Sequence, residues 1–292
     1  MDNLLPYVSD LIRDFHTYPF LLRTLLASIL VGLTCSFLSV FVVLKKLAFI
    51  GQGISHAAFG GIALGFWLFP ALTTPNLSVY GITVGFCMLV AFGIALTSRT
   101  EMVSDDSAIG IYFAASMALG VIFMSLRANY TTEVFHFLFG TVLAVTPEDL
   151  YYLTGLAILV FGAGLLHFKE FYAYCFDPLF AEVIGINTSF LHYLLLSLLA
   201  LTIVLAVKVV GVIMVTAFLV IPGACARQMT LRFKWMVFFS LLVGIFSSVV
   251  GVLLSNSKLD LPPGALIVAV QFAIFLLLQI VQRMKLFFVR EP

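Results

Sequence analysis

The sequence predicts an all-α fold, a polytopic bundle of about eight or nine transmembrane helices. Composition is the first observation behind this prediction. Of the 292 residues, 62% are hydrophobic and only 10% are charged, whereas a soluble domain carries about 25% charged residues. The second observation is a mean hydropathy of +1.16. The third is a series of apolar segments, each near the length of about 20 residues that crosses the hydrocarbon core of a membrane as a helix.

The first segment, residues 1–18, predicts an amphipathic helix that lies on the membrane surface. Its apolar side chains recur with a helical period, at Leu4, Leu5, Val8, Leu11, Ile12 and Phe15. We do not expect a cleaved signal peptide, because aspartates and other polar residues interrupt the continuous apolar core that a signal needs. We expect residues 19–285 to form a single transmembrane domain and residues 286–292 to form a cytoplasmic tail.

Nine apolar segments supply the expected spans, at residues 19–44, 50–69, 77–98, 107–126, 150–167, 188–207, 209–226, 235–255 and 263–283. Two of them adjoin near Lys208, which predicts either a tight turn or a kink in one long element. A further apolar stretch, Phe135 to Val145, is too short to cross a membrane and is followed by Pro147. We expect this stretch to be re-entrant or interfacial.

Lysine and arginine residues predict the orientation, because cytoplasmic loops carry an excess of both. With a cytoplasmic C-terminal tail and nine crossings counted backwards, 10 of the 15 such residues fall on the cytoplasmic side, namely Lys45, Lys46, Arg99, Lys169, Arg227, Arg232, Lys234, Arg283, Lys285 and Arg290. The outer side then holds Arg13, Arg23, Arg127, Lys208 and Lys258. The ratio favours a cytoplasmic C-terminus.

Composition and missing motifs exclude several functions. The apolar composition argues against a soluble enzyme or a disordered scaffold, and a net charge of +1 gives no general attraction to nucleic acid. The sequence lacks a P-loop, an H-E-x-x-H motif and a G-x-S-x-G motif, so we expect neither a nucleotide site nor an enzyme. Active transport by such a chain would use an ion gradient or a separate ATPase. The four cysteines share no CxxC spacing and are expected to be buried, unpaired side chains.

The densest polar group inside an apolar segment lies between Gly51 and Ala58. In a helix, Gln52 and His56 stand one turn apart on the same face. Small residues surround His56, and they either allow helices to approach closely or leave room for a solute. Two interpretations stay open: a histidine that is hydrogen-bonded between packed helices, or a side chain that lines a transport route.

Two further stretches have marked local patterns. Asp177 followed by Pro178 predicts a helix start with an aspartate N-cap and proline at the first helical position, and Gly185 is expected to close that helix. Pro222-Gly223 is expected to break a span near the cytoplasmic face, before a short helix that leads to basic residues. That helix would either dock a cytoplasmic partner or act as a basic anchor.

Taken together, four stretches resemble the zinc/manganese/iron permease family of bacterial ABC importers, over about residues 20–283. They are residues 37–51 with the following Ser55-His56-Ala57, residues 176–182, residues 210–227, and Asp260-Leu-Pro-Pro-Gly-Ala, which includes Pro262, Pro263 and Gly264. The resemblance implies a fold similar to that of vitamin B12/siderophore-type permeases. It also implies a multi-pass subunit of the bacterial inner membrane that moves zinc, manganese or iron ions into the cytoplasm.

The resemblance implies partners as well. A second permease chain, identical or paralogous, an extracytoplasmic metal-binding protein and a pair of cytoplasmic ATPase subunits are expected, together with the lipid membrane, whereas nucleic acid is not. The chain is expected to bind no cofactor of its own, only the transported divalent metal ion. By the same resemblance, the coupling region at about residues 222–234 contacts the ATPase, with Pro222, Gly223, Ala224, Ala226 and Arg227 as its main residues.

One departure from the family pattern concerns the pathway, for which His56 and Gln52 are the candidate residues. The family usually has an aspartate four residues before the transmembrane histidine, and this chain has Gln52 there. Manganese favours oxygen ligands, whereas imidazole suits several metals. The chain is therefore a candidate for a paralogous subunit whose partner supplies the charge. A gradient-driven secondary transporter and a membrane assembly protein are the alternative functions.

Overall fold

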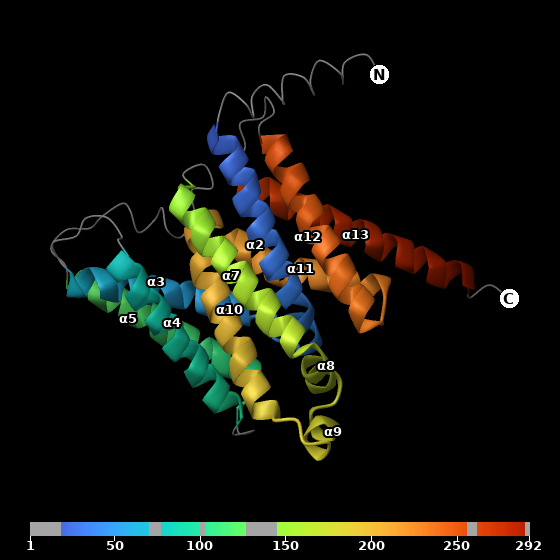
Figure 1. The fold of residues 1–292 in the computed structure, drawn as a ribbon, viewed down its shortest axis with the longest axis horizontal. Coiled ribbons are helices and arrows are strands. Elements are labelled where there is room, and N and C mark those ends of the chain that lie inside the picture. The colour runs from blue at the N-terminus through green and yellow to red at the C-terminus, as the bar shows by residue number, and fades with distance from the viewer. Residues whose placement is uncertain (1–18, 70–76, 100–102, 127–144, 256–261, 290–292) are drawn as a thin grey trace, which may run out of the picture.

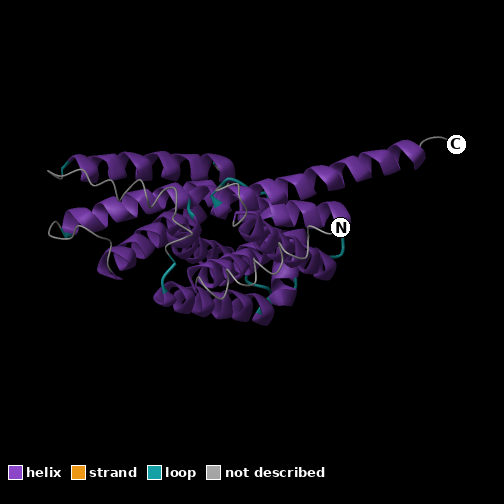
Figure 2. Cartoon of the chain, turned by 90° about the horizontal axis from the view of Figure 1, so that it is seen from above, coloured by secondary structure: helices purple, strands orange, loops and turns teal. Residues whose placement is uncertain are grey.

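The computed structural model describes residues 19–69, 77–99, 103–126, 145–255 and 262–289. Some expectations therefore lie outside the described residues: the surface helix of residues 1–18, the stretch from Phe135 up to Ala144, Asp260, and the end of the tail at residues 290–292. Every regular element in the described part of the chain is a helix, which confirms the all-α prediction (Figure 2).

Among the described residues, nine long helices correspond to the nine predicted segments: α2 (Pro19–Leu44), α3 (Ile50–Leu68), α4 (Leu77–Ser98), α5 (Asp105–Ser125), α7 (Pro147–Leu166), α10 (Thr188–Val210), α11 (Val212–Met229), α12 (Phe233–Ser255) and α13 (Pro263–Val289). Seven of them are long and apolar enough to cross a membrane on their own, and α11 contains a shorter apolar helix. Helix α3 is not among the seven; it contains several glycines together with Gln52, Ser55 and His56.

Two short helices, α8 (Phe168–Phe176) and α9 (Pro178–Val183), join α7 to α10. They lie together at one end of the bundle, beyond the ends of α7 and α10 (Figure 1). The side chain of Asp177 accepts a hydrogen bond from the Phe180 amide at 3.0 Å, and Gly185 adopts a positive φ of 86° after the last turn. The predicted helix start at Asp177-Pro178 and its end at Gly185 are both confirmed.

The helices form two groups with α7 and α10 between them (Figure 1). One group consists of α3, α4 and α5, in which α3 packs against both neighbours; in the other, α2 packs against α11 and α12, and α13 packs against α11 and α12. Helices α2 and α10 are the most buried of the apolar spans, whereas α13 is mostly exposed. The C-terminal part of α13 extends beyond the rest of the bundle (Figure 2).

Serine and glycine residues let α2 and α12 approach each other closely. The hydroxyl of Ser240 donates to the Ser36 carbonyl at 2.6 Å, and that of Ser248 donates to the Ser28 carbonyl at 3.0 Å. A Cβ atom added to Gly244 would lie 2.0 Å from the Ser36 hydroxyl. Because lipid tails are as apolar as leucine, membrane helices associate through such close packing and interhelical hydrogen bonds rather than through the hydrophobic effect.

The predicted discontinuity near Lys208 is a tight turn at Gly211, where α10 ends and α11 begins. Gly211 has φ 81° and ψ 164°, a backbone conformation that is essentially restricted to glycine. One residue therefore separates two helices, of which α10 packs mainly against α4 and α11 packs mainly against α2 and α12.

The predicted break at Pro222-Gly223 is wrong, because α11 continues through both residues to Met229. Proline in a helix interior removes one backbone hydrogen bond and favours a kink. Here the surrounding contacts hold the helix together. The amide of Gly223 donates to the hydroxyl of Ser39 on α2 at 2.8 Å, and both Pro222 and Gly223 are buried. The helix ends only at Thr230, whose backbone is extended.

Candidate functional site

One end of the bundle gathers the basic links between helices, and we call it the basic end. Lys45 after α2, Arg99 after α4, Asp105 at the start of α5 and Thr188 at the start of α10 line a single cavity there. A groove at the same end lies between α8 and the α11–α12 link, which carries Arg232. The excess of lysine and arginine in these links predicts that this end faces the cytoplasm.

The candidate pathway residues lie on α3 near the basic end. Gln52 is exposed and lines a cavity of about 290 Å³ between α3 and α5, together with Asp106 and Phe113. One turn further along, the half-buried ring of His56 contacts the ring of Phe113 edge-on, with 5.1 Å between the centroids. The buried Nδ1 of His56 has no hydrogen-bond partner among the described residues. This observation does not favour the first interpretation, in which His56 is hydrogen-bonded between packed helices.

The small residues around His56 serve close packing. A Cβ atom added to Gly60 would lie 2.7 Å from the Ser116 carbonyl on α5, and one added to Gly61 would lie 2.9 Å from Thr83 on α4. Both glycines are buried. Of the two predicted roles of these small residues, the structure therefore supports close helix approach at Gly60 and Gly61.

The cavity at the ends of α2, α4, α5, α9 and α10 is polar and has a volume of about 310 Å³. The Tyr174 hydroxyl and Nδ1 of His192 are hydrogen-bonded at 2.8 Å, and Nζ of Lys45 lies 4.0 Å from the centre of the Tyr174 ring. Burial lowers the pKa of Lys45, while nearby Cys175 and Asp105 oppose that shift. Burial also raises the pKa of the Cys175 thiol to about 12.

A second surface of the basic end is apolar and basic. A groove of about 510 Å³ runs between α8 and the α11–α12 link, lined by Phe168, Lys169, Tyr172, Leu231, Arg232, Phe233, Lys234 and Trp235. Phe233 anchors the link, because its ring packs against those of Phe168 and Tyr172. Large apolar side chains are exposed outside the spans: Leu231 in the groove lining is 81% exposed, and Val183 on α9 is 84% exposed.

The predicted coupling region contains both buried and exposed residues. Ala226 is fully buried, Pro222 is buried, and Gly223 is buried against α2, so these three offer no surface to a partner. Ala224 is half-buried and Arg227 is exposed. Only the exposed part of residues 222–234 can touch another protein directly.

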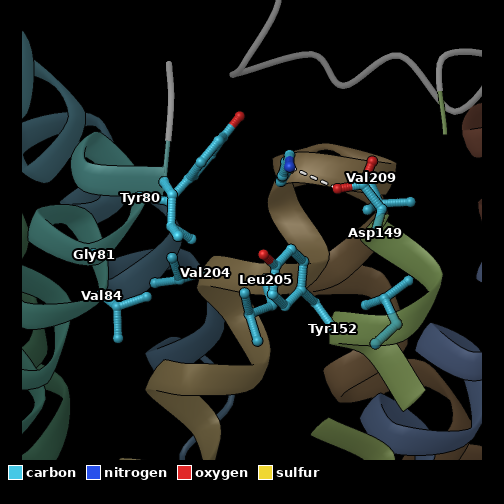
Figure 3. A pocket seen from close by; sticks show the side chains of 11 residues that line it. Tyr80, Gly81, Val84, Asp149, Tyr152, Val204, Leu205 and Val209 are labelled. Atoms are coloured by element: carbon cyan, nitrogen blue, oxygen red, sulfur yellow. Dashed lines mark ion pairs between the residues drawn. The ribbon is translucent and has the colours of Figure 1, made fainter. Parts of the chain in front are cut away.

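The opposite end of the bundle holds an ion pair that the sequence analysis missed. Nζ of Lys208 on α10 lies 2.6 Å from Oδ1 of Asp149 on α7 and 4.3 Å from the centre of the Tyr80 ring on α4. Figure 3 shows the pair at a largely apolar cavity of about 230 Å³, beside Tyr152 and Leu205. Asp149 also forms a capping box with Thr146. The pair ties three helices together at this end.

The predicted proline motif begins α13. Pro263 is the first helical residue, and the carbonyl of Pro262 accepts a hydrogen bond from the Leu266 amide at 3.3 Å. Proline at the first helical position costs no hydrogen bond, because that amide has no partner within the helix. Gly264 lies beside Met214 and the backbone of Val210, next to the turn between α10 and α11. The motif therefore packs the start of α13 against that turn.

Comparison with known proteins agrees with this architecture. Residues 17–282 match the ABC 3 transport family. The chain is 35% identical over 258 residues to the manganese transport system membrane protein MntC of Listeria monocytogenes, covering 88% of this chain and 89% of that protein. It is 37% identical over 279 residues to the chelated iron transport system membrane protein YfeD of Yersinia pestis, covering 94% and 90%.

A solved structure extends the similarity to three dimensions. PsaBC from Streptococcus pneumoniae in complex with Fab matches with a TM-score of 0.79 and 31% identity, over 93% of this chain and 95% of that chain. The similarity in sequence and the similarity in structure therefore both extend over nearly the whole chain. The chain belongs to the ABC 3 transport family, as the resemblance of its motifs predicts.

Proposed function

We propose that the chain is the permease subunit of an ATP-binding-cassette importer that moves divalent manganese or iron ions into the cytoplasm. The similarity to relatives named for manganese and chelated-iron transport carries this proposal, because it extends over 88% and 94% of the chain. The α3 face with Gln52 and His56 supports it, since a permeating ion needs ligands that replace part of its hydration shell. Zinc is the third candidate substrate, because imidazole also suits zinc.

A second permease chain, identical or paralogous, completes the proposed pathway. One copy offers a single imidazole and a single amide on the α3 face. The described part of the chain holds no group of three or more His, Cys, Asp or Glu side chains that could hold a metal ion. Two copies around a common axis offer two of each ligand. An extracytoplasmic metal-binding protein would deliver the ion at the end opposite the basic end.

A separate pair of ATPase subunits supplies the energy in this proposal, because the chain has no P-loop. The basic end is the surface on which they dock. Leu179, Val183 and Leu231 are each more than 70% exposed there, and exposed apolar side chains outside the spans are suited to contact with another protein. The predicted coupling region contributes its exposed residues, Arg227 and those of the α11–α12 link, to the same surface.

The proposed function is tested by manganese and iron uptake in cells that depend on this importer. His56→Ala is expected to reduce uptake by at least about tenfold at unchanged expression, because the variant loses the imidazole ligand of the pathway. Leu89→Ala is the control, since Leu89 is 72% exposed within α4 and lies apart from both the α3 face and the basic end. Uptake by His56→Ala at the wild-type rate would show that His56 only packs between helices.

A further inference from the structure

Two helix faces meet at the cavity beside Gln52. On α3 and just before it, Phe49, Gln52 and Gly53 line the cavity, and on α5 the lining residues are Asp106, Ile109, Gly110 and Phe113. Both sets follow the three- and four-residue spacing of a single helix face. A Cβ atom added to Gly53 would lie 2.7 Å from the Ile109 side chain, so the two helices are in close contact at the inner edge of the cavity.

Asp106 is the one ionisable side chain among the described residues that line this cavity. It is exposed, and no ion pair joins it to a cation within the described ranges. The amide of Gln52 contributes an oxygen without charge. The N-termini of α3 and α5 both lie at this cavity, and the positive ends of their helix dipoles repel a cation. The carboxylate of Asp106 offsets that repulsion and makes the cavity suitable for a divalent ion.

The neighbouring Asp105 has a different environment. It lines the polar cavity that also contains Lys45 and Arg99, and its charge acts on Lys45. Two consecutive aspartates in the first turn of α5 thus face two separate cavities. Asp105 shares its cavity with the cations Lys45 and Arg99, whereas Asp106 shares its cavity with Gln52.

We propose that Asp106 is a ligand of the transported ion at the cytoplasmic end of the pathway, and that it supplies from α5 the carboxylate that position 52 lacks on α3. The inference rests on the proposed function, because it concerns the route of the same ion. The ion would pass between the imidazole of His56 and the oxygen atoms of Gln52 and Asp106. Phe113 connects the cavity to His56, since it lines the cavity and its ring contacts that of His56.

The test compares three variants in the complete importer, reconstituted in nanodiscs, by titration with Mn²⁺ and detection of the free ion by electron paramagnetic resonance. Asp106→Asn is expected to weaken Mn²⁺ binding by at least about tenfold, since even an outer-sphere group contributes that much to metal affinity. Asp105→Asn is expected to bind Mn²⁺ as the wild type does. The double variant Gln52→Asp/Asp106→Asn is expected to regain the affinity, because it returns a carboxylate to the same cavity.

The outcomes separate the inference from the proposed function. Equal Mn²⁺ affinities of Asp106→Asn and Asp105→Asn would overturn the role of Asp106, and so would a double variant that binds as weakly as Asp106→Asn. Uptake of ⁵⁴Mn²⁺ by proteoliposomes containing the wild type is measured beside these titrations. Wild-type uptake together with equal affinities would refute the inference alone, whereas a wild type that neither binds nor imports Mn²⁺ would refute the proposed function and the inference with it.

Discussion

Gly223 lies where α11 crosses α2, and the backbones there are too close for a side chain. A Cβ atom at this position would lie 2.5 Å from the Ser39 carbonyl oxygen. The neighbouring Pro222 and Ala226 are buried as well. These residues are therefore fixed by packing inside the chain. A bulky side chain at position 226 is expected to disturb folding before it disturbs contact with an ATPase.

Gly223→Ala is expected to destabilise the protein by about 1–3 kcal/mol, the usual range for an added methyl group in a tightly packed core. The matched control is Gly85→Ala on α4, because a Cβ atom there meets nothing within 4 Å. Alanine has the higher helix propensity, so the control is expected to be neutral or stabilising by up to about 1 kcal/mol. Thermal unfolding of both variants in detergent measures the difference. Equal unfolding temperatures would contradict the close crossing of α2 and α11.

At the scale of elements, local patterns are enough to predict the nine long helices and the start and end of α9. Asp177, Pro178 and Gly185 carry their information within a few residues, and α9 begins and ends where they predict. The break at Pro222 was wrong because burial against α2, a tertiary effect, outweighs the local preference of proline. Similarly, no sequence pattern could bring together the cavity of Lys45, Arg99 and His192, whose lining comes from five helices and their links.

Helix α9 is expected to carry part of the ATPase-docking surface. Val183→Asp puts a charge into the proposed contact and is expected to weaken ATPase binding by at least about 1 kcal/mol. Less ATPase should therefore co-purify with the variant. The side chain is 84% exposed, so the fold should be unaffected. Leu77→Asp is the matched control, because Leu77 is 72% exposed and lies at the opposite end of the bundle. Unchanged ATPase binding by Val183→Asp would refute docking through α9.

For the whole molecule, the number and order of the helices fix which links share a side of the membrane. The chain is a multi-pass bacterial membrane protein with seven independently apolar spans in its described part. The basic end holds the links after α2, α4, α7 and α11, in agreement with the lysine and arginine distribution of the sequence. The Lys208–Asp149 pair lies at the other end.

Cysteine labelling tests this orientation. After replacement of the partly exposed Cys175, the remaining native cysteines are buried. Lys46→Cys is expected to react with a membrane-impermeant maleimide only in inside-out vesicles, because Lys46 is exposed at the basic end. Glu148→Cys, exposed at the opposite end, is expected to react only in right-side-out vesicles. The reverse pattern would place the basic end outside the cell.

The central claim is that this chain is the permease of an ATP-driven metal importer, and its most direct test is ⁵⁴Mn²⁺ uptake by proteoliposomes. They contain the permease pair, its ATPase subunits and the metal-binding protein, and they receive either ATP or an imposed ion gradient. We expect uptake to require ATP hydrolysis on the ATPase side and to persist when ionophores dissipate every ion gradient. Uptake driven by a gradient without ATP would contradict the account and identify a secondary transporter.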